Sequence, residues 1–155
     1  MASSTPNFWF CDFECYQFMS LNMYVKEIAI LSHDAKHCYN YHIFYPYSMA
    51  TNVQDKKTEE FQYRRHRLPW GLGDFTFNDA INDIKEKVGF NDDIFVKGLE
   101  KSLFIKQYLS NIKCMDEHPS IHKLNNCLNE VCEIPHSFYC ARRKVHELHY
   151  MYNNL

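Results

Sequence analysis

Hydrophobic and polar positions alternate along the first third of the chain. This pattern predicts strands over residues 8–16, 24–31 and 39–45, which are rich in aromatic and β-branched residues. The second strand is interrupted only by Lys26 and Glu27, which indicates a segment that runs from the surface into the core. Short connections between the three strands favour an antiparallel meander.

The later part of the chain alternates between helical and strand patterns. Helices are predicted over residues 75–88, 99–110, 120–131 and 136–152, and strands over 93–97 and 111–115. Asn78 and Ser120 are the expected caps of two of these helices. In the helix over 99–110, the residues expected to face inward are Leu103, Phe104, Tyr108 and Leu109.

This order of elements predicts an α/β fold. Three antiparallel strands followed by parallel strands with helical crossovers give a mixed five-stranded sheet with helices packed on its faces. Residues 46–70 have proline at both ends, a charged middle and weak periodicity. They predict a long surface loop that continues to about residue 74, with a short helix around 57–65. We expect residues 1–155 to form a single domain.

Composition and charge narrow the function. Hydrophobic residues make up 46% of the chain and charged residues 23%, so a packed core is expected. The net charge is −2 and the sequence pI is about 6.5. A nucleic-acid partner would therefore need a local basic patch, because the domain as a whole is not basic.

The cysteines and the N-terminal sequence suggest a compartment. The seven cysteines have no regular spacing, and the first residues contain neither a signal peptide nor a membrane-length apolar stretch. We expect reduced thiols, a cytoplasmic or nuclear location and no membrane association, with metal binding as another use for the cysteines.

Asp12 and Glu14 form an acidic pair on the first predicted strand. Residues i and i+2 of a strand point to the same face, so the two carboxylates would stand side by side. Such a pair can hold magnesium or manganese and activate water for nuclease chemistry. An acidic pair on a solvated face is the alternative interpretation.

A cluster of cysteine and histidine follows near the C-terminus, in the segment CLNEVCEIPHSFYC. Its members are Cys127, Cys132, His136 and Cys140. Thiolate and imidazole are ligands that suit tetrahedral zinc. The alternative is that the cysteines are buried, inert thiols.

A basic run, YRRHR, lies in the predicted loop close to a tryptophan. The candidate nucleic-acid-binding residues are Tyr63, Arg64, Arg65, Arg67 and Trp70. They would contact phosphates and stack on a base. A solvated loop without a ligand is the alternative.

The order of these features resembles that of a DEDDh 3′–5′ exonuclease of the RNase H-like superfamily. The resemblance rests on DFE in the first strand, VKG at the start of a helix, a short strand ending in Asp, and P-S-x-x-K-L before the last helix. It spans most of the chain and implies an RNase H-like fold.

The resemblance preserves only the first catalytic motif, in Asp12 and Glu14. The positions implied for the other catalytic residues are occupied instead by Ser102 or Leu103, by Tyr139 and by Lys144. A lysine there would repel a divalent cation, so an ordinary two-metal exonuclease is not expected.

The substitutions are more similar to those of the Maelstrom domain family of the piRNA gene-silencing pathway. That family resembles the same exonucleases but binds zinc through a Glu-Cys-His-Cys set. The resemblance implies a structural zinc held by Glu14, Cys132, His136 and Cys140, with Cys127 as an alternative ligand, although the spacing between the ligands differs. The chain is also similar to uncharacterised insect proteins associated with mobile elements.

Three functions remain open at this point. The first is a catalytically degenerate exonuclease-like domain that binds RNA, a protein or both, with a structural zinc. The second is an active single-strand ribonuclease that uses Asp12 and Glu14, with magnesium or manganese or by unusual chemistry. The third is a structural interaction module without a ligand.

Overall fold

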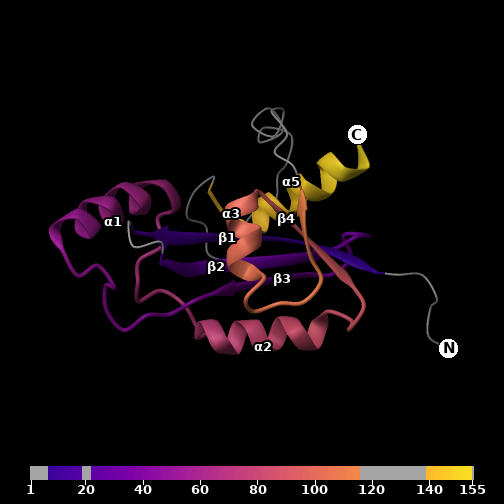
Figure 1. Cartoon of the computed structure of the whole chain (residues 1–155), viewed down its shortest axis with the longest axis horizontal. Coiled ribbons are helices and arrows are strands. Elements are labelled where there is room, and N and C mark those ends of the chain that lie inside the picture. The colour runs from indigo at the N-terminus through magenta and orange to yellow at the C-terminus, as the bar shows by residue number, and fades with distance from the viewer. Residues whose placement is uncertain (1–6, 19–21, 116–138, 155) are drawn as a thin grey trace.

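A mixed five-stranded sheet forms the centre of the protein. The computed structural model describes residues 7–18, 22–115 and 139–154. The strands are β1 (Phe8–Gln17), β2 (Met23–Ser32), β3 (Cys38–His42), β4 (Asp93–Lys97) and β5 (Ile112–Met115). Their order is β3-β2-β1-β4-β5 (Figure 1). β1 pairs antiparallel with β2, and β2 with β3, whereas β4 pairs parallel with β1 and β5. The predicted α/β class and mixed sheet are confirmed.

Helices cover both faces of this sheet. α2 (Phe77–Lys87) and α3 (Leu99–Ile105) pack on one face, and α5 (Ala141–Asn153) packs on the other (Figure 1). The α2 side buries Cys11, Phe13 and Ile28. The α5 side buries a smaller cluster, which consists of Phe10, Ala29, Leu31, Ala141, Val145, Leu148 and Met151. The predicted helix over 120–131 and the start of the one over 136–152 lie outside the described residues.

The short helix predicted around 57–65 within the long loop is present but longer than expected, because Val53–His66 form the helix α1. The Asn52 side chain caps it by accepting a hydrogen bond from the Asp55 backbone N–H at 2.8 Å. Only Asp55 and His66 of this helix are buried, so it has no apolar stripe for a periodicity argument to detect.

α1 lies at the end of the sheet where β1 finishes (Figure 1). The Gln62 side chain joins the two elements. Its oxygen accepts from the Gln17 backbone N–H at 2.8 Å, and its amide donates to the Gln17 carbonyl at 2.9 Å. The helix therefore borders the carboxyl end of β1.

Two of the predicted helices differ in detail. Thr76, not Asn78, caps α2, since its hydroxyl accepts a hydrogen bond from the Asp79 backbone N–H at 3.1 Å. α3 ends at Ile105 instead of continuing to residue 110. Its buried face also differs from the predicted one, because Leu103, which was expected to face inward, is 56% exposed. Tyr108, expected to face inward, is likewise exposed.

Strand β3 ends at His42 instead of at residue 45. Beyond it, Phe44 and Tyr45 donate their backbone N–H groups to the carbonyls of Phe75 and Trp70. The chain therefore leaves the sheet ladder to pair with the segment that precedes α2.

The expectation that β2 runs from the surface into the core at Lys26 and Glu27 is also wrong, because both residues are fully buried. The Lys26 ammonium donates to the carbonyls of Ile43, Trp70 and Leu72, at 2.7 Å for Trp70 and 2.9 Å for Leu72. Burial lowers the pKa of Lys26 to about 8. The lysine thus fixes the segment before α2 against β2, and within the described ranges its hydrogen-bond acceptors are all backbone carbonyls.

Among the helices of the described residues, none is long and apolar enough to cross a bilayer. The cysteines described are all free thiols, namely Cys11, Cys15, Cys38, Cys114 and Cys140.

Candidate functional site

The predicted acidic pair lies on β1, on the face that α5 covers. Phe10, two residues before Asp12, packs beneath α5, while Cys11 and Phe13 face the opposite core. Asp12 and Glu14 are both largely buried. They follow the last residue pair between β1 and β4, which is Cys11 with Val96. The pair therefore lies where β1 extends past its parallel neighbour.

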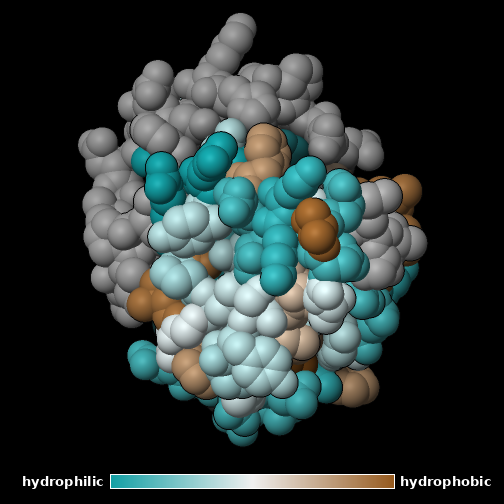
Figure 2. Space-filling model, turned by 90° about the vertical axis from the view of Figure 1, so that its left-hand side faces the viewer, coloured by the Kyte–Doolittle hydropathy of each residue, from teal (hydrophilic) through white to brown (hydrophobic). Residues whose placement is uncertain are grey.

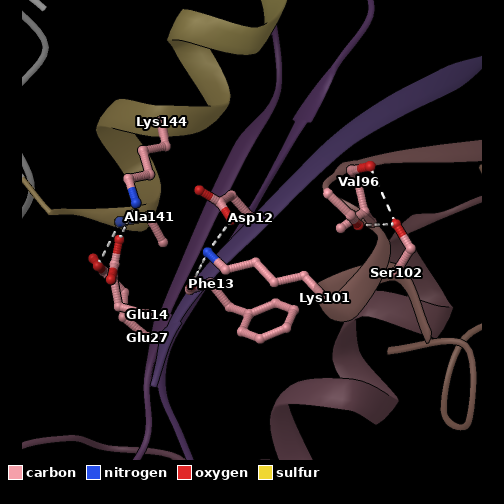
Figure 3. Close-up of polar contacts among 10 residues, drawn as sticks. Asp12, Phe13, Glu14, Glu27, Val96, Lys101, Ser102, Ala141 and Lys144 are labelled. Carbon is pink, nitrogen blue, oxygen red and sulfur yellow. Dashed lines mark hydrogen bonds and ion pairs between the residues drawn. The ribbon is translucent and has the colours of Figure 1, made fainter. Parts of the chain in front are cut away.

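Lys101 of α3 neutralises the first carboxylate. Its Nζ lies 2.7 Å from Asp12 Oδ1 and also donates to the Phe13 carbonyl at 2.6 Å (Figure 3). Sequence reasoning missed this residue, although it directly precedes Ser102, where the resemblance placed a catalytic aspartate. The segment in which the resemblance implies an acidic residue therefore supplies a lysine instead, one position before Ser102.

Lys144 of α5 neutralises the second carboxylate. Its Nζ lies 2.8 Å from Glu14 Oε1, and it reaches down from the first turns of the helix (Figure 3). The resemblance placed a second metal-binding aspartate at this position. Each carboxylate of the pair therefore has its own ammonium partner.

The four charged groups act on one another. Burial alone would raise the pKa of the Asp12 carboxyl, but the Lys101 and Lys144 ammonium groups outweigh it and hold that pKa below its usual value. Burial opposes the charge on Lys101, but the Asp12 and Glu14 carboxylates raise the pKa of its ammonium. Asp12 and Lys101 are therefore both ionised at neutral pH.

The other positions implied by the resemblance contribute no carboxylate. The Ser102 hydroxyl lies 2.7 Å from the Gly98 carbonyl oxygen and 3.2 Å from that of Val96, so it secures the start of α3. Leu103 points toward solvent. Asp12 and Glu14 do not fit a pair of divalent cations as they stand, because ammonium groups lie against their oxygens.

A second polar cluster lies beside the pair, around the buried carboxylate of Glu27. Glu27 is the cross-strand neighbour of Glu14 on one side and of His42 on the other. Glu27 Oε1 accepts from the Ala141 backbone N–H at 2.7 Å (Figure 3). Its Oε2 lies 3.2 Å from His42 Nε2 and 3.6 Å from Cys140 Sγ, which donates to it.

This cluster bears on the predicted zinc site. The carboxylate next to Cys140 is that of Glu27, whereas Glu14 is paired with Lys144. Sequence reasoning missed Glu27 because a charge inside a strand pattern resembles a surface position. The other predicted ligands, Cys127, Cys132 and His136, lie outside the described residues. Within the described ranges, no group of three His, Cys, Asp or Glu side chains is arranged to hold a metal ion.

The predicted basic run lies at the C-terminal end of α1, with Arg64, Arg65 and Arg67 exposed. The Arg65 guanidinium carbon is 4.4 Å from the centroid of the Tyr139 ring, and Lys144 Nζ is 5.4 Å from the same centroid. Tyr139 therefore connects the basic run to the cation that pairs with Glu14.

Not every member of the run is available to a ligand. The Trp70 ring stacks on Tyr16 with centroids 4.1 Å apart and planes 15° apart. Its indole N–H donates to Glu59. His66 is buried, and its Nδ1 accepts from the Leu68 backbone N–H. Figure 2, which looks onto the end of the molecule where α1 lies, shows a mostly hydrophilic surface with scattered hydrophobic residues.

A comparison with protein-family models and with curated proteins found no match to this chain. We therefore infer the chemistry of the site from its own side chains. Two carboxylates are held by two ammonium groups, next to a further basic surface. Such an arrangement can bind anions more readily than it can activate water with a metal.

The Lys101–Asp12 pair predicts a specific stability pattern. Lys101→Met leaves the buried Asp12 carboxylate without its cation, so we expect a loss of about 1–3 kcal/mol in the free energy of unfolding at pH 7. This is less than for a fully buried pair, because the lysine is partly exposed. Lys101→Met/Asp12→Asn should recover most of the loss. Urea denaturation measures both variants.

The pH dependence of the same pair follows from the sign of the pKa shift. The folded pKa of Asp12 lies below its unfolded value of 3.8, so its ionisation stabilises the fold above that pH. The contribution is lost as the pH falls through the folded pKa. The difference in the free energy of unfolding between the wild type and Lys101→Met should shrink in that range. A Lys101→Met variant with wild-type stability at pH 7 would contradict the assignment.

Proposed function

We propose that this chain is a catalytically degenerate RNase H-like exonuclease domain that binds single-stranded RNA without hydrolysing it. Support for the fold comes from the three antiparallel strands followed by parallel ones, with helices on both faces. Support for the ancestry comes from Asp12 and Glu14, which lie side by side on the central strand β1. The same function accounts for the loss of the later acidic residues.

The observation that carries the proposal is the pair of ammonium groups at the acidic residues. Two-metal hydrolysis needs carboxylate oxygens that are open to Mg²⁺ or Mn²⁺. Here Lys101 and Lys144 lie within 2.8 Å of those oxygens. A divalent cation placed there would displace or repel two positive charges. The third and fourth carboxylates that would offset this cost are absent, because Ser102 and Lys144 occupy the positions that the resemblance implies for them.

Binding of RNA is assigned to the basic end of α1. Arg64 and Arg65 are exposed in the last turn of the helix, and Arg67 follows it. Because the chain has a net charge of −2, such a local patch is the feature that attracts phosphates. The proposal is supported by the contacts of the Tyr139 ring with Arg65 and Lys144, which link this patch to the acidic pair on β1.

This function predicts binding without cleavage. A labelled single-stranded RNA should keep its length after incubation with the full chain and Mg²⁺ or Mn²⁺, and binding should persist in EDTA. Arg64→Ala/Arg65→Ala should weaken binding and lower the salt slope by about 0.7 for each phosphate that the variant no longer neutralises. Lys56→Ala/Lys57→Ala, near the other end of the same helix, removes the same charge and should leave the slope unchanged.

Two outcomes would overturn the proposal. Metal-dependent shortening of RNA that Asp12→Asn abolishes would establish an active nuclease. An absence of RNA binding by the wild type would leave an interaction module as the better explanation of the fold.

We also propose that the domain holds a structural zinc in which Glu27, and not Glu14, joins Cys140. Support comes from the 3.6 Å contact between Cys140 Sγ and Glu27 Oε2, and from the burial of both residues. Cys132 and His136 complete the proposed set, and His42 lies beside Glu27. When bound, the ion would link β2 to the start of α5 and stabilise the fold without entering the reaction chemistry.

The zinc proposal predicts different zinc contents for variants of Glu14 and of Glu27. Purified wild type and Glu14→Gln should each contain a single zinc ion by elemental analysis, whereas Glu27→Gln and Cys140→Ser should lose it together with thermal stability. Glu14→Gln is the matched control, since it makes the same chemical change on the neighbouring strand. A wild-type chain without zinc, or loss of zinc in Glu14→Gln alone, would reject this assignment.

A further inference from the structure

Lys101 and Lys144 form the outer layer of the acidic site. They come from helices on opposite faces of the sheet, and each reaches a carboxylate near the middle of β1 (Figure 3). Their side chains are 27% and 26% exposed, whereas the Asp12 and Glu14 side chains beneath them are only 6% and 11% exposed. A molecule that approaches this site from solvent therefore meets cations before it meets anions.

Both ammonium groups retain donors for such a molecule. An ammonium has three N–H donors. Among the described residues, Lys101 uses two of them, on Asp12 and on the Phe13 carbonyl. Lys144 forms an ion pair with Glu14 Oε1 at 2.8 Å, and among the same residues that oxygen accepts no hydrogen bond. Each lysine thus has at least one N–H free to donate to a further acceptor.

The cations of this site face solvent, where an anion would approach, and the carboxylates lie beneath them. Two carboxylates and two ammonium groups sum to zero, which is also the sum for four carboxylates with two divalent cations. Of the other acidic residues nearby, Glu147 lies 3.6 Å from Arg143, Glu27 is buried against His42, and Glu100 accepts from the neutral Gln17 side chain. Arg65, which contacts the same Tyr139 ring as Lys144, adds a further exposed cation beside the two lysines.

We propose that Lys101 and Lys144 form a metal-independent phosphate-binding site, in which each ammonium bridges a β1 carboxylate and a backbone phosphate of single-stranded RNA. In a two-metal nuclease, the metal ions make this bridge. Lysine binds phosphate as a point charge, so it can hold the group without polarising it for attack. The choice of RNA as the source of the phosphate rests on the proposed function.

The test uses paired substitutions that keep the net charge of the chain. Lys144→Met/Glu14→Gln and Lys101→Met/Asp12→Asn each remove one ammonium and the carboxylate beneath it, so no buried charge is left alone. Binding of a labelled single-stranded RNA is measured in EDTA over a range of salt concentrations. Lys85→Met/Glu86→Gln, on the exposed side of α2, is the control for a neutral paired change.

Each site variant should bind RNA about tenfold more weakly, with a salt slope lower by about 0.7, while the control binds as the wild type does. Thermal unfolding shows which variants are folded, and either folded pair is sufficient for the test. Wild-type affinity and slope in a folded site variant would overturn the phosphate site while leaving RNA binding by α1 intact.

The phosphate site and the proposed function can fail separately. If the wild type binds no RNA, the proposed function fails. Titration with inorganic phosphate then tests whether Lys101 and Lys144 bind phosphate. Shifts of the Lys101 and Lys144 Nζ resonances that the paired variants abolish would retain a site for small phosphates. Nζ resonances that stay unchanged during the phosphate titration would contradict the phosphate site.

Discussion

Two buried carboxylates on the central strand need positive partners, and much of the arrangement around β1 follows from that need. Asp12 and Glu14 lie under α5, where an ionised carboxylate without a partner is costly. Lys101 and Lys144 meet this requirement from α3 and α5. The two ion pairs therefore also attach a helix on each face of the sheet to the same strand.

The start of α5 is held by a third buried carboxylate, that of Glu27. Glu27 accepts the Ala141 backbone N–H at 2.7 Å, so a negative charge lies at the N-terminus of the helix, where the helix dipole favours it. Lys144 then lies one turn further along, above Glu14. The positions of the helix and of the cation over the acidic pair are thus linked through neighbouring residues of β1 and β2.

The sequence predicts some of this well and some of it poorly, for identifiable reasons. Alternation along β1 and β2 predicts the strands, and the two-residue spacing of Asp12 and Glu14 predicts their common face. The exposed helix α1 has no apolar stripe, so its residues resemble a loop. Glu27 and Lys101 gain their roles only when distant strands and helices come together, which no local pattern reports. In the seven-residue helix α3, too few turns exist for periodicity to fix which residues face inward.

The central claim is that ammonium groups have replaced divalent cations at Asp12 and Glu14. The most direct measurement is a Mn²⁺ titration of the wild-type chain, followed by paramagnetic broadening of the backbone amide signals of Cys11, Phe13 and Cys15. These signals should broaden no more than those beside the exposed acidic residues of α1. Selective broadening at substoichiometric Mn²⁺, reversed by excess Mg²⁺, would show that the pair still binds a divalent cation and would contradict the account.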